Sequence, residues 1–343
     1  MSLSVNIEKK LGEFQLRVEF ETAGALLALL GASGSGKSVT LRCIAGLLRP
    51  DRGRILLNGR VLFDSEQNID LPPQKRRVGY LFQRCALIPQ RSVLENVELG
   101  LHAKPRAERR AAALALLERF RLTALADALP ATLSGGEAQR CALARTLAAE
   151  PEALLLDEPF SALDEYLKWE LELELAQTLE GYGGDAILVT HSRDEVCRLA
   201  DAVCVLSGGR SEPVRSAAEM MRAPGTLAAA LLSGCKNLSP VRVLPDGSLH
   251  CEAWGWRLPA LPVPAGLSHV GIRAHSLGLG PGPLSLDCTL DRIIDNVFSY
   301  ILTLGTPGGG QLRLECDKQT PLPTPGSPVQ VHTDTKEILL LTK

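Results

Sequence analysis

Long apolar runs are absent from this sequence. The longest purely aliphatic stretches are about five residues, such as residues 26–30, whereas a helix needs about 20 to cross a bilayer. The chain is therefore not expected to span a membrane. Residues 1–8 also lack the basic and apolar regions of a signal peptide, so we expect the protein in the cytoplasm.

An excess of positive charge and paired cysteine motifs are absent too. The 37 Lys and Arg face 39 Asp and Glu, whereas proteins that bind nucleic acid usually carry a basic excess. The 9 cysteines contain no C-x-x-C pair, which favours small apolar fillers in a reducing compartment over a disulfide framework. The content of 45% hydrophobic and 22% charged residues is typical of a globular protein, and 343 residues predict two domains.

Proline marks the expected boundary between the two domains. Residues 235–343 contain 12 of the 22 prolines, and they alternate short apolar runs with turn sequences such as Pro-Asp-Gly at 245–247. Strands interrupted by frequent turns predict a small all-β domain. This segment has balanced charge, with nine Lys and Arg against nine Asp and Glu, so it offers no basic surface for nucleic acid.

Residues 1–234 follow a different pattern. Apolar and polar residues alternate over 14–20, which predicts a half-buried strand of an antiparallel hairpin. Continuous apolar runs are typical of buried parallel strands and occur at 26–30, 153–156 and 186–189. Helical stretches rich in Ala, Leu, Glu and Arg stand between them, at 107–120 and 134–149. This alternation predicts an α/β layer fold.

A phosphate-binding loop follows the strand at 26–30. Residues 31–38 match G-x-x-x-x-G-K-[ST] and precede an apolar helical stretch at 41–48, which is the context that the motif requires. A fortuitous Gly/Ser turn is the alternative, and this context argues against it. Lys37 is expected to reach the β- and γ-phosphates and Ser38 to bind Mg²⁺. Backbone N–H groups of the loop would surround the phosphates of ATP, from Gly31, Ala32, Ser33, Gly34, Ser35, Gly36, Lys37, Ser38 and Val39.

Two carboxylates end the apolar strand at 153–156. Asp157 is placed to hold Mg²⁺, and Glu158 to polarise an attacking water. Carboxylates here could also do no more than cap a strand end, and that interpretation would be favoured if the phosphate loop were missing. Beside the loop, they predict an ATP-hydrolysing site.

A serine and two glycines open the helix expected at 134–149. Ser134 and Glu137 form an S-x-x-E capping box. Gly135 and Gly136 weaken a first helical turn unless another group must approach its backbone closely. Exposed N–H groups beside a serine hydroxyl suit an anion, here the γ-phosphate of a nucleotide bound by another subunit.

These motifs, in this order and followed by His191, resemble the ATP-binding subunits of ABC transporters over roughly residues 1–230. The resemblance implies a mixed sheet with an antiparallel β edge and a helical subdomain. It implies a homodimer in which the signature Ser134–Glu137 completes the ATP site of the opposite subunit. Gln83 falls at the loop that touches Mg²⁺ and senses the membrane partner, Asp164 in the D-loop that crosses the dimer interface, and His191 at the switch that contacts the γ-phosphate.

Two positions depart from that family's pattern. Val39 stands where a threonine usually follows the loop serine, so a hydroxyl contact to the α-phosphate is lost while the Val39 N–H can still donate. An aromatic side chain that stacks on adenine is expected near residues 11–14. Leu11 occupies the usual place, and Phe14 is a weak substitute.

Segments 54–64 and 71–80 look most like those of molybdate importer ATPases. The C-terminal domain resembles the extra β domain of such proteins, an oligonucleotide/oligosaccharide fold or a molybdate-binding-like barrel. Importers of sulfate, ferric iron and polyamines share this layout and remain alternatives. The basic run 75–77 is interpreted as a solvated loop cluster rather than a nucleic-acid patch.

The expected function is that of the ATP-hydrolysing, energy-coupling subunit of a bacterial importer for molybdate or a related oxyanion, with ATP and Mg²⁺. It would lie peripherally at the cytoplasmic face of the inner membrane. There it would dock on integral-membrane permease subunits through residues 84–96, with Leu87–Pro89 as apolar contact. An extracytoplasmic substrate-binding protein would act with it indirectly.

Two other classes are open. A soluble ABC ATPase acting on nucleic acid or ribosomes is disfavoured by the single phosphate loop, the lack of heptads and the lack of a basic tail. A regulatory module without turnover is disfavoured by Glu158 and His191. Residues 235–343 are expected either to bind the imported oxyanion as feedback, with Ser285, Ser299, Lys318 and nearby glycine-rich turns as candidate donors, or to be a passive dimerisation or solubility element.

Overall fold

The computed structural model describes residues 2–22, 24–83, 85–161 and 165–343, with the backbone alone at 165–167. The chain divides into two compact units, Met1–Ala217 and Ala218–Lys343. This division lies before the boundary at residue 234 that the sequence suggested. Residues between the two positions contact the second unit, because Arg273 Nη1 donates to the Ser233 carbonyl at 3.0 Å and Ala230 packs against Leu341.

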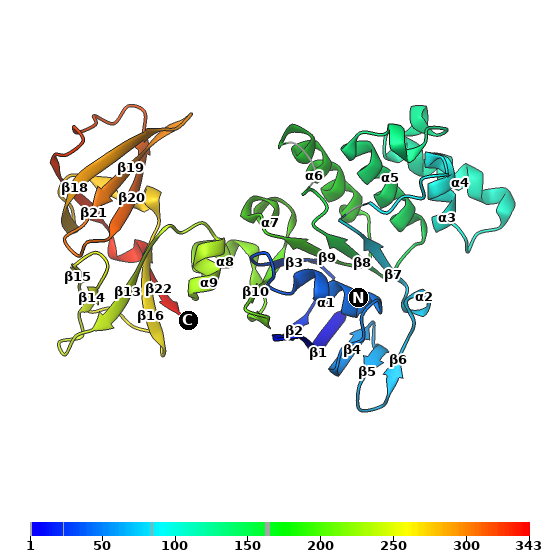
Figure 1. Ribbon diagram of the computed structural model, residues 1–343, viewed down its shortest axis with the longest axis horizontal. Coiled ribbons are helices and arrows are strands. Elements are labelled where there is room, and N and C mark those ends of the chain that lie inside the picture. Colours follow the sequence, from blue (N-terminus) through cyan, green and yellow to red (C-terminus); the bar gives the residue numbers. More distant parts are fainter. Residues whose placement is uncertain (1, 23, 84, 162–164) are drawn as a thin grey trace. The chain divides into compact units, whose positions relative to one another are not determined.

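The first unit is built on a 12-stranded sheet (Figure 1). Its antiparallel part has the order β6-β5-β4-β1-β2, and its parallel part has the order β10-β3-β9-β8-β7. The strands are β1 (Leu3–Leu11), β2 (Phe14–Glu21), β3 (Leu26–Leu30), β4 (Arg52–Leu57), β5 (Arg60–Asp64), β6 (Ile69–Asp70), β7 (Val78–Leu81), β8 (Ala153–Asp157), β9 (Asp185–Thr190), β10 (Ala202–Ser207), β11 (Arg210–Ser211) and β12 (Arg215–Ser216).

The strand predictions for this unit are confirmed. β2 alternates between buried and exposed residues and pairs with β1 as an antiparallel hairpin. Every residue of β3, β8 and β9 is buried, as expected for parallel strands that are covered on both faces. The sheet therefore combines the antiparallel edge and the buried parallel centre that the apolar patterns predicted.

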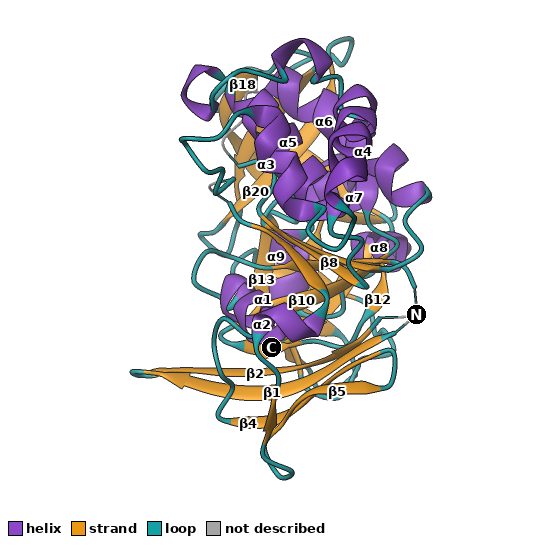
Figure 2. Cartoon of the chain, turned by 90° about the vertical axis from the view of Figure 1, so that its right-hand side faces the viewer, coloured by secondary structure: helices purple, strands orange, loops and turns teal. Residues whose placement is uncertain are grey.

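Helices cover both faces of the parallel strands. Leu155 packs into one core together with α1, and Leu154 and Leu156 pack into another with α3, α4 and α5, because successive strand residues face opposite ways. Figure 2 shows α3–α6 above β8 and α1 below it. The helices are α1 (Lys37–Ala45), α2 (Pro73–Arg76), α3 (Val93–Gly100), α4 (Arg106–Arg119), α5 (Gly135–Ala148), α6 (Glu165–Glu180), α7 (Arg193–Leu199), α8 (Ala217–Arg222) and α9 (Leu227–Leu232). None of the described helices is long and apolar enough to cross a membrane.

The second unit contains two five-stranded antiparallel sheets, β15-β14-β13-β16-β22 and β17-β21-β18-β19-β20. Leu249 and Val270 from the first sheet share one core with Leu290 and Leu302 from the second. Two sheets closed around one core form the small β domain that the turn-rich sequence predicted. The strands are β13 (Asn237–Val243), β14 (Leu249–Cys251), β15 (Trp256–Leu258), β16 (Leu267–Ile272), β17 (Gly278–Leu279), β18 (Leu284–Asp295), β19 (Ser299–Gly305), β20 (Gln311–Asp317), β21 (Pro328–Thr333) and β22 (Ile338–Thr342).

One arginine of the basic run 75–77 is buried in the first unit. Arg76 Nη1 donates to the carbonyls of Cys43 and Ile44, each at 2.8 Å, and Nη2 bonds Asp70 at 2.8 Å. Its side chain is fully buried, so the interpretation of this run as a solvated cluster is wrong for Arg76. Its guanidinium bonds carbonyls at the C-terminal end of α1, where the helix runs out of backbone donors. The helix that carries the phosphate-loop lysine is thereby fixed at its far end.

We expect Arg76→Ala to lower the free energy of unfolding by about 1–3 kcal/mol, because it removes the buried donor to two helix-end carbonyls. Denaturant unfolding measures the loss. Arg77→Ala is the matched control, since the Arg77 side chain is exposed and bonds Glu152 at 3.1 Å; removal of such a surface pair costs about 1 kcal/mol or less. Equal losses in the two variants would contradict the assigned role of Arg76.

Candidate functional site

The loop between β3 and α1 is shaped by its glycines. Gly34 and Gly36 have φ of 79° and 106°, which side-chain-bearing residues rarely adopt. A Cβ on Gly36 would lie 2.5 Å from Leu16 Cδ1 on β2. Only glycine therefore allows the loop to turn into α1 this close to the neighbouring strand.

Lys37 is folded back onto the same loop. Its Nζ donates to the carbonyls of Gly31 at 2.8 Å and Ala32 at 3.0 Å. Burial lowers the pKa of Lys37, while the nearby carboxylates of Glu158 and Asp157 act in the opposite direction. The ammonium is thus held inside the loop, at the place where the motif binds phosphate oxygens.

The Asp157 carboxylate at the end of β8 is held on both sides. Ser38 Oγ donates to its Oδ1 at 2.7 Å, and the Tyr80 hydroxyl donates to its Oδ2 at 2.7 Å. Burial, and then Asp157 itself, raise the pKa of Tyr80. The sequence motifs did not identify Tyr80. Tyr80 could have been found from its position near the end of β7, because β7 pairs in parallel with β8, which ends at Asp157.

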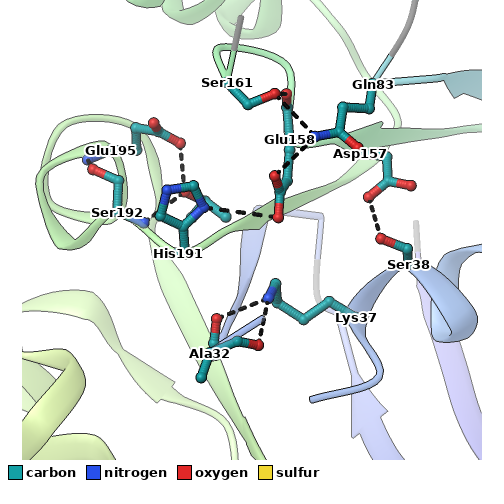
Figure 3. A network of polar contacts seen from close by, with 12 residues as sticks. Ala32, Lys37, Ser38, Gln83, Asp157, Glu158, Ser161, His191, Ser192 and Glu195 are labelled. Carbon is teal, nitrogen blue, oxygen red and sulfur yellow. Dashed lines mark hydrogen bonds and ion pairs between the residues drawn. The ribbon is translucent and has the colours of Figure 1, made fainter. Parts of the chain in front are cut away.

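Glu158 meets two other predicted residues at the ends of neighbouring strands (Figure 3). Its Oε2 accepts from Gln83 Nε2 at 3.2 Å, and its Oε1 lies 3.7 Å from His191 Nδ1. Glu158 has a positive φ of 47°, and its N–H donates to the Val189 carbonyl at 3.1 Å. Gln83 also bonds Ser161 Oγ at 3.3 Å. The structure therefore gathers Gln83, Glu158 and His191 from positions after β7, β8 and β9.

The site offers oxygen atoms of the kind that Mg²⁺ prefers. The Ser38 hydroxyl and the Asp157 carboxylate are in direct contact, and Mg²⁺ is commonly held by one or two protein ligands together with phosphate oxygens and water. Within the described residues, no three His, Cys, Asp or Glu side chains gather as a metal cluster. Gln83 bonds Glu158 rather than the Ser38–Asp157 pair. The two contacting oxygens nevertheless fit a metal that is shared with a nucleotide.

The signature residues cap α5 as predicted. Ser134 Oγ accepts from the Glu137 N–H at 3.3 Å, and Glu137 Oε2 accepts from the Ser134 N–H at 2.7 Å. Hydrogen bonds from the Ser134 backbone and hydroxyl hold the pKa of Glu137 below its usual value. Over the part of the chain that the structure describes, no hydrogen bond or ion pair joins Ser134–Glu137 to residues 31–38.

The remaining predicted positions fall in different places. Asp164 lies outside the described residues. Phe14 is half-buried and borders the phosphate loop, because a Cβ on Gly36 would lie 3.2 Å from its ring. Leu11 is exposed, and Val39 packs against the core beneath the loop. The aromatic candidate therefore lies beside the loop rather than free in solvent.

The candidate oxyanion donors of the second unit already have partners. Ser285 Oγ bonds the backbone of Gly282 at 3.0 Å, and Ser299 Oγ donates to Glu315 Oε1 at 2.7 Å. Lys318 bonds Asp295, and its Nζ lies 4.2 Å from the centre of the Tyr300 ring. Ser285 pairs with β21, whereas Ser299 pairs with β20. These donors do not gather into one anion site, and two of them face carboxylates.

The sequence is similar to those of known ATP-binding import proteins. The family model described as ABC transporter matches residues 16–161. The molybdenum import ATP-binding protein of Paramagnetospirillum magneticum is 43% identical over 65% of this chain and 61% of that protein. The protein of the same description from Rhodospirillum rubrum is 33% identical over 93% of this chain and 87% of that protein.

The chain is also similar to a sulfate/thiosulfate import protein and to a solved ATP-binding cassette. The sulfate/thiosulfate import ATP-binding protein of Bradyrhizobium diazoefficiens is 39% identical over 80% of this chain and 81% of that protein. A solved dimeric ATP-binding cassette in a post-hydrolysis state, bound to ADP and phosphate, is 32% identical. It superposes with a TM-score of 0.53, covering 63% of this chain and 99% of the cassette.

We expect Glu158→Gln to retain ATP binding and to lower kcat about 10²- to 10⁴-fold, the usual contribution of a general base. Steady-state ATPase assays and nucleotide-binding titrations measure the two quantities, and the ATP-bound dimer should accumulate in this variant. Glu150→Gln is the control, because the Glu150 side chain is exposed and bonds Lys104. Near-normal hydrolysis by Glu158→Gln would remove Glu158 from this role.

Proposed function

Because this chain belongs to the ABC transporter family, whose ATP-binding import proteins are ATPases coupled to transport, we propose that it is the energy-coupling subunit of a bacterial importer for molybdate or a related oxyanion. The observation that carries the proposal is the convergence of Gln83, Glu158 and His191 beside the Ser38–Asp157 pair (Figure 3). Ligands of open α/β sheets bind outside the carboxyl ends of the strands, where all five side chains lie.

Each of these groups has a distinct task in hydrolysis. The N–H groups of residues 31–39 cradle the phosphates, and the Lys37 ammonium exchanges its loop carbonyls for phosphate oxygens. Ser38 and Asp157, with Gln83, would hold Mg²⁺, which neutralises phosphate charge when bound. Glu158 accepts a proton from the attacking water, and the His191 imidazole donates to the γ-phosphate. Phe14, beside the loop, is the weak candidate for stacking on adenine.

A second copy of the chain completes each site. Ser134, Gly135, Gly136 and Glu137 form the N-terminus of α5, where Ser134 and Gly135 are exposed, and within the described residues they make no bond to the phosphate loop of their own subunit. Backbone N–H groups at such an end bind anions, so they suit the γ-phosphate of the partner's ATP. Asp164 would belong to the same interface. The solved cassette described as dimeric supports this arrangement.

The partner in the membrane is a permease. Gln83 stands before a segment in which Ile88 is exposed and Leu87 half-buried, and Asn96 Oδ1 fixes this segment through the Ile88 N–H at 2.9 Å. An exposed apolar segment on a rigid support suits a short permease helix. The protein would then lie peripherally at the cytoplasmic face of the inner membrane, with an extracytoplasmic binding protein acting on it only through the permease.

Molybdate is proposed ahead of sulfate because the Rhodospirillum rubrum molybdenum protein matches along 93% of this chain. Sulfate and ferric-iron import proteins match at 39–40% identity over shorter parts of the chain, which keeps them as alternatives. The second unit is proposed to regulate or to dimerise. An oxyanion bound there would have to displace the carboxylates that now hold Ser299 and Lys318.

Subunits that carry Ser134→Arg, mixed with subunits that carry Lys37→Ala, should test the shared site. Each homodimer lacks one half of both sites, whereas a mixed dimer has one intact site. Equal mixing should therefore restore at most about a quarter of the normal ATPase activity. ATPase activity linear in protein concentration, with no dimer detected in the presence of ATP, would contradict the shared site.

Reconstitution with the permease and binding protein in vesicles tests the cargo. We expect ATPase activity and uptake to rise several-fold with molybdate-loaded binding protein and to stay near the basal level with sulfate, ferric iron or a polyamine. Glu158→Gln in the same vesicles is the control for uptake driven by hydrolysis. Stimulation by sulfate alone would replace molybdate as the cargo and leave the ATPase assignment intact.

A further inference from the structure

The Thr190 side chain links the backbone on the far side of His191 to a buried carboxylate. The Thr190 hydroxyl donates to Glu195 Oε2 at 2.5 Å. Because a hydroxyl has one hydrogen, its oxygen remains free to accept, and it accepts the Ser192 N–H at 2.9 Å. Figure 3 shows Ser192 and Glu195 beside His191. The residues on both sides of the histidine are thus tied to one carboxylate.

The carboxylate is anchored in turn by α6. Lys168 Nζ lies 2.7 Å from Glu195 Oε1, and the side chains of Lys168 and Glu195 are only 17% and 6% exposed. Thr190 is buried as well. Both oxygens of Glu195 therefore have a partner on a different element, one on β9 and one on α6. Ser192 Oγ accepts from the Glu195 N–H at 3.4 Å and so caps α7, while the Glu195 side chain serves this network.

The structure shows no close hydrogen bond to the His191 imidazole among the described residues. Its side chain is 59% exposed, and the polar contact that the structure shows for it, to Glu158 Oε1, is 3.7 Å long, which is beyond hydrogen-bonding distance. Its position thus follows from the backbone at Thr190–Ser192. A displacement of about 1 Å in a group that acts on the reacting atoms can cost about 100-fold in rate.

We propose that Glu195 and Lys168 are positioning residues for His191. They act on hydrolysis through Thr190 and the Ser192 N–H, and they do not touch the nucleotide. This inference rests on the proposed role of His191 at the γ-phosphate. Loss of the Glu195 carboxylate releases the Thr190 hydroxyl and leaves the Lys168 ammonium without its partner. Nucleotide binding by the phosphate loop is unaffected, so kcat falls while KM for ATP stays constant.

The same two helices provide a matched control. Glu172 on α6 and Arg198 on α7 form a second ion pair, with distances of 2.5 and 3.0 Å, and the Glu172 side chain is buried. Lys168 and Glu172 are four residues apart on α6, so they lie on one helix face. Among the described contacts, none joins Glu172 or Arg198 to Thr190, Ser192 or His191. This second pair joins the helices without reaching the histidine.

A double-mutant cycle on the full chain tests the proposal. Glu195→Gln should lower kcat about 10-fold at constant KM, and His191→Ala about 100-fold or more. Because Glu195 acts through His191, the double variant should show the kcat of His191→Ala alone. Glu172→Gln should lower the thermal midpoint but keep kcat within about twofold of the parent, because it acts on packing and not on the site. Circular dichroism checks that each variant folds.

Two variants at Thr190 test the same proposal if the Glu195 variant does not fold. Thr190→Val removes only the hydroxyl and should lower kcat as Glu195→Gln does, whereas Thr190→Ser keeps the hydroxyl and should retain most of the activity. Additive effects of Glu195→Gln and His191→Ala, or an equal loss of kcat in Glu172→Gln, would overturn the positioning role. Unchanged kcat in His191→Ala would instead show that the proposed role of the histidine itself had failed, and the inference with it.

Discussion

The burial of β8 is the constraint on which the site depends. All five of its residues are buried between β7 and β9 and between two hydrophobic cores. A strand covered in this way can carry charged groups only at its end, where other polar groups can bond them. Asp157 and Glu158 emerge there, between Tyr80 from β7 and the Val189 carbonyl from β9. The same packing that stabilises the sheet therefore places both carboxylates at the end of β8.

Three buried charged groups of the first unit, Lys37, Arg76 and Asp157, each have hydrogen-bonding partners. Lys37 rests on loop carbonyls, Asp157 on two hydroxyls, and Arg76 on helix-end carbonyls and Asp70. A charged group that is buried without partners is strongly destabilising. These groups keep partners while no nucleotide is bound, and Lys37 and Ser38 can exchange theirs for phosphate or metal oxygens. The binding site is thereby preorganised without leaving charges uncompensated.

The second unit reaches stability by a different route. Two antiparallel sheets share one apolar core, and the Asn237 side chain bonds the Arg313 backbone at 2.7 and 2.8 Å, which ties β13 to β20. Of the candidate oxyanion donors, Ser299 and Lys318 bond nearby carboxylates, and Ser285 bonds the backbone of its own turn. Such pairing favours a role in which ligand binding or dimerisation rearranges existing contacts over one in which a ready anion site waits for its ligand.

Sequence alone determined the strands, the phosphate loop and the chemical character of Ser38, Asp157, Glu158 and His191, because these depend on local patterns of a few residues. It placed Ser134–Glu137 on a helix N-terminus for the same reason. Only the tertiary structure revealed Tyr80, Lys168 and Thr190 as partners, and Arg76 as a buried cap rather than a solvated charge. Their roles depend on which strands and helices become neighbours in space, and hydrogen bonds between residues far apart in the chain leave no periodic signal in the sequence.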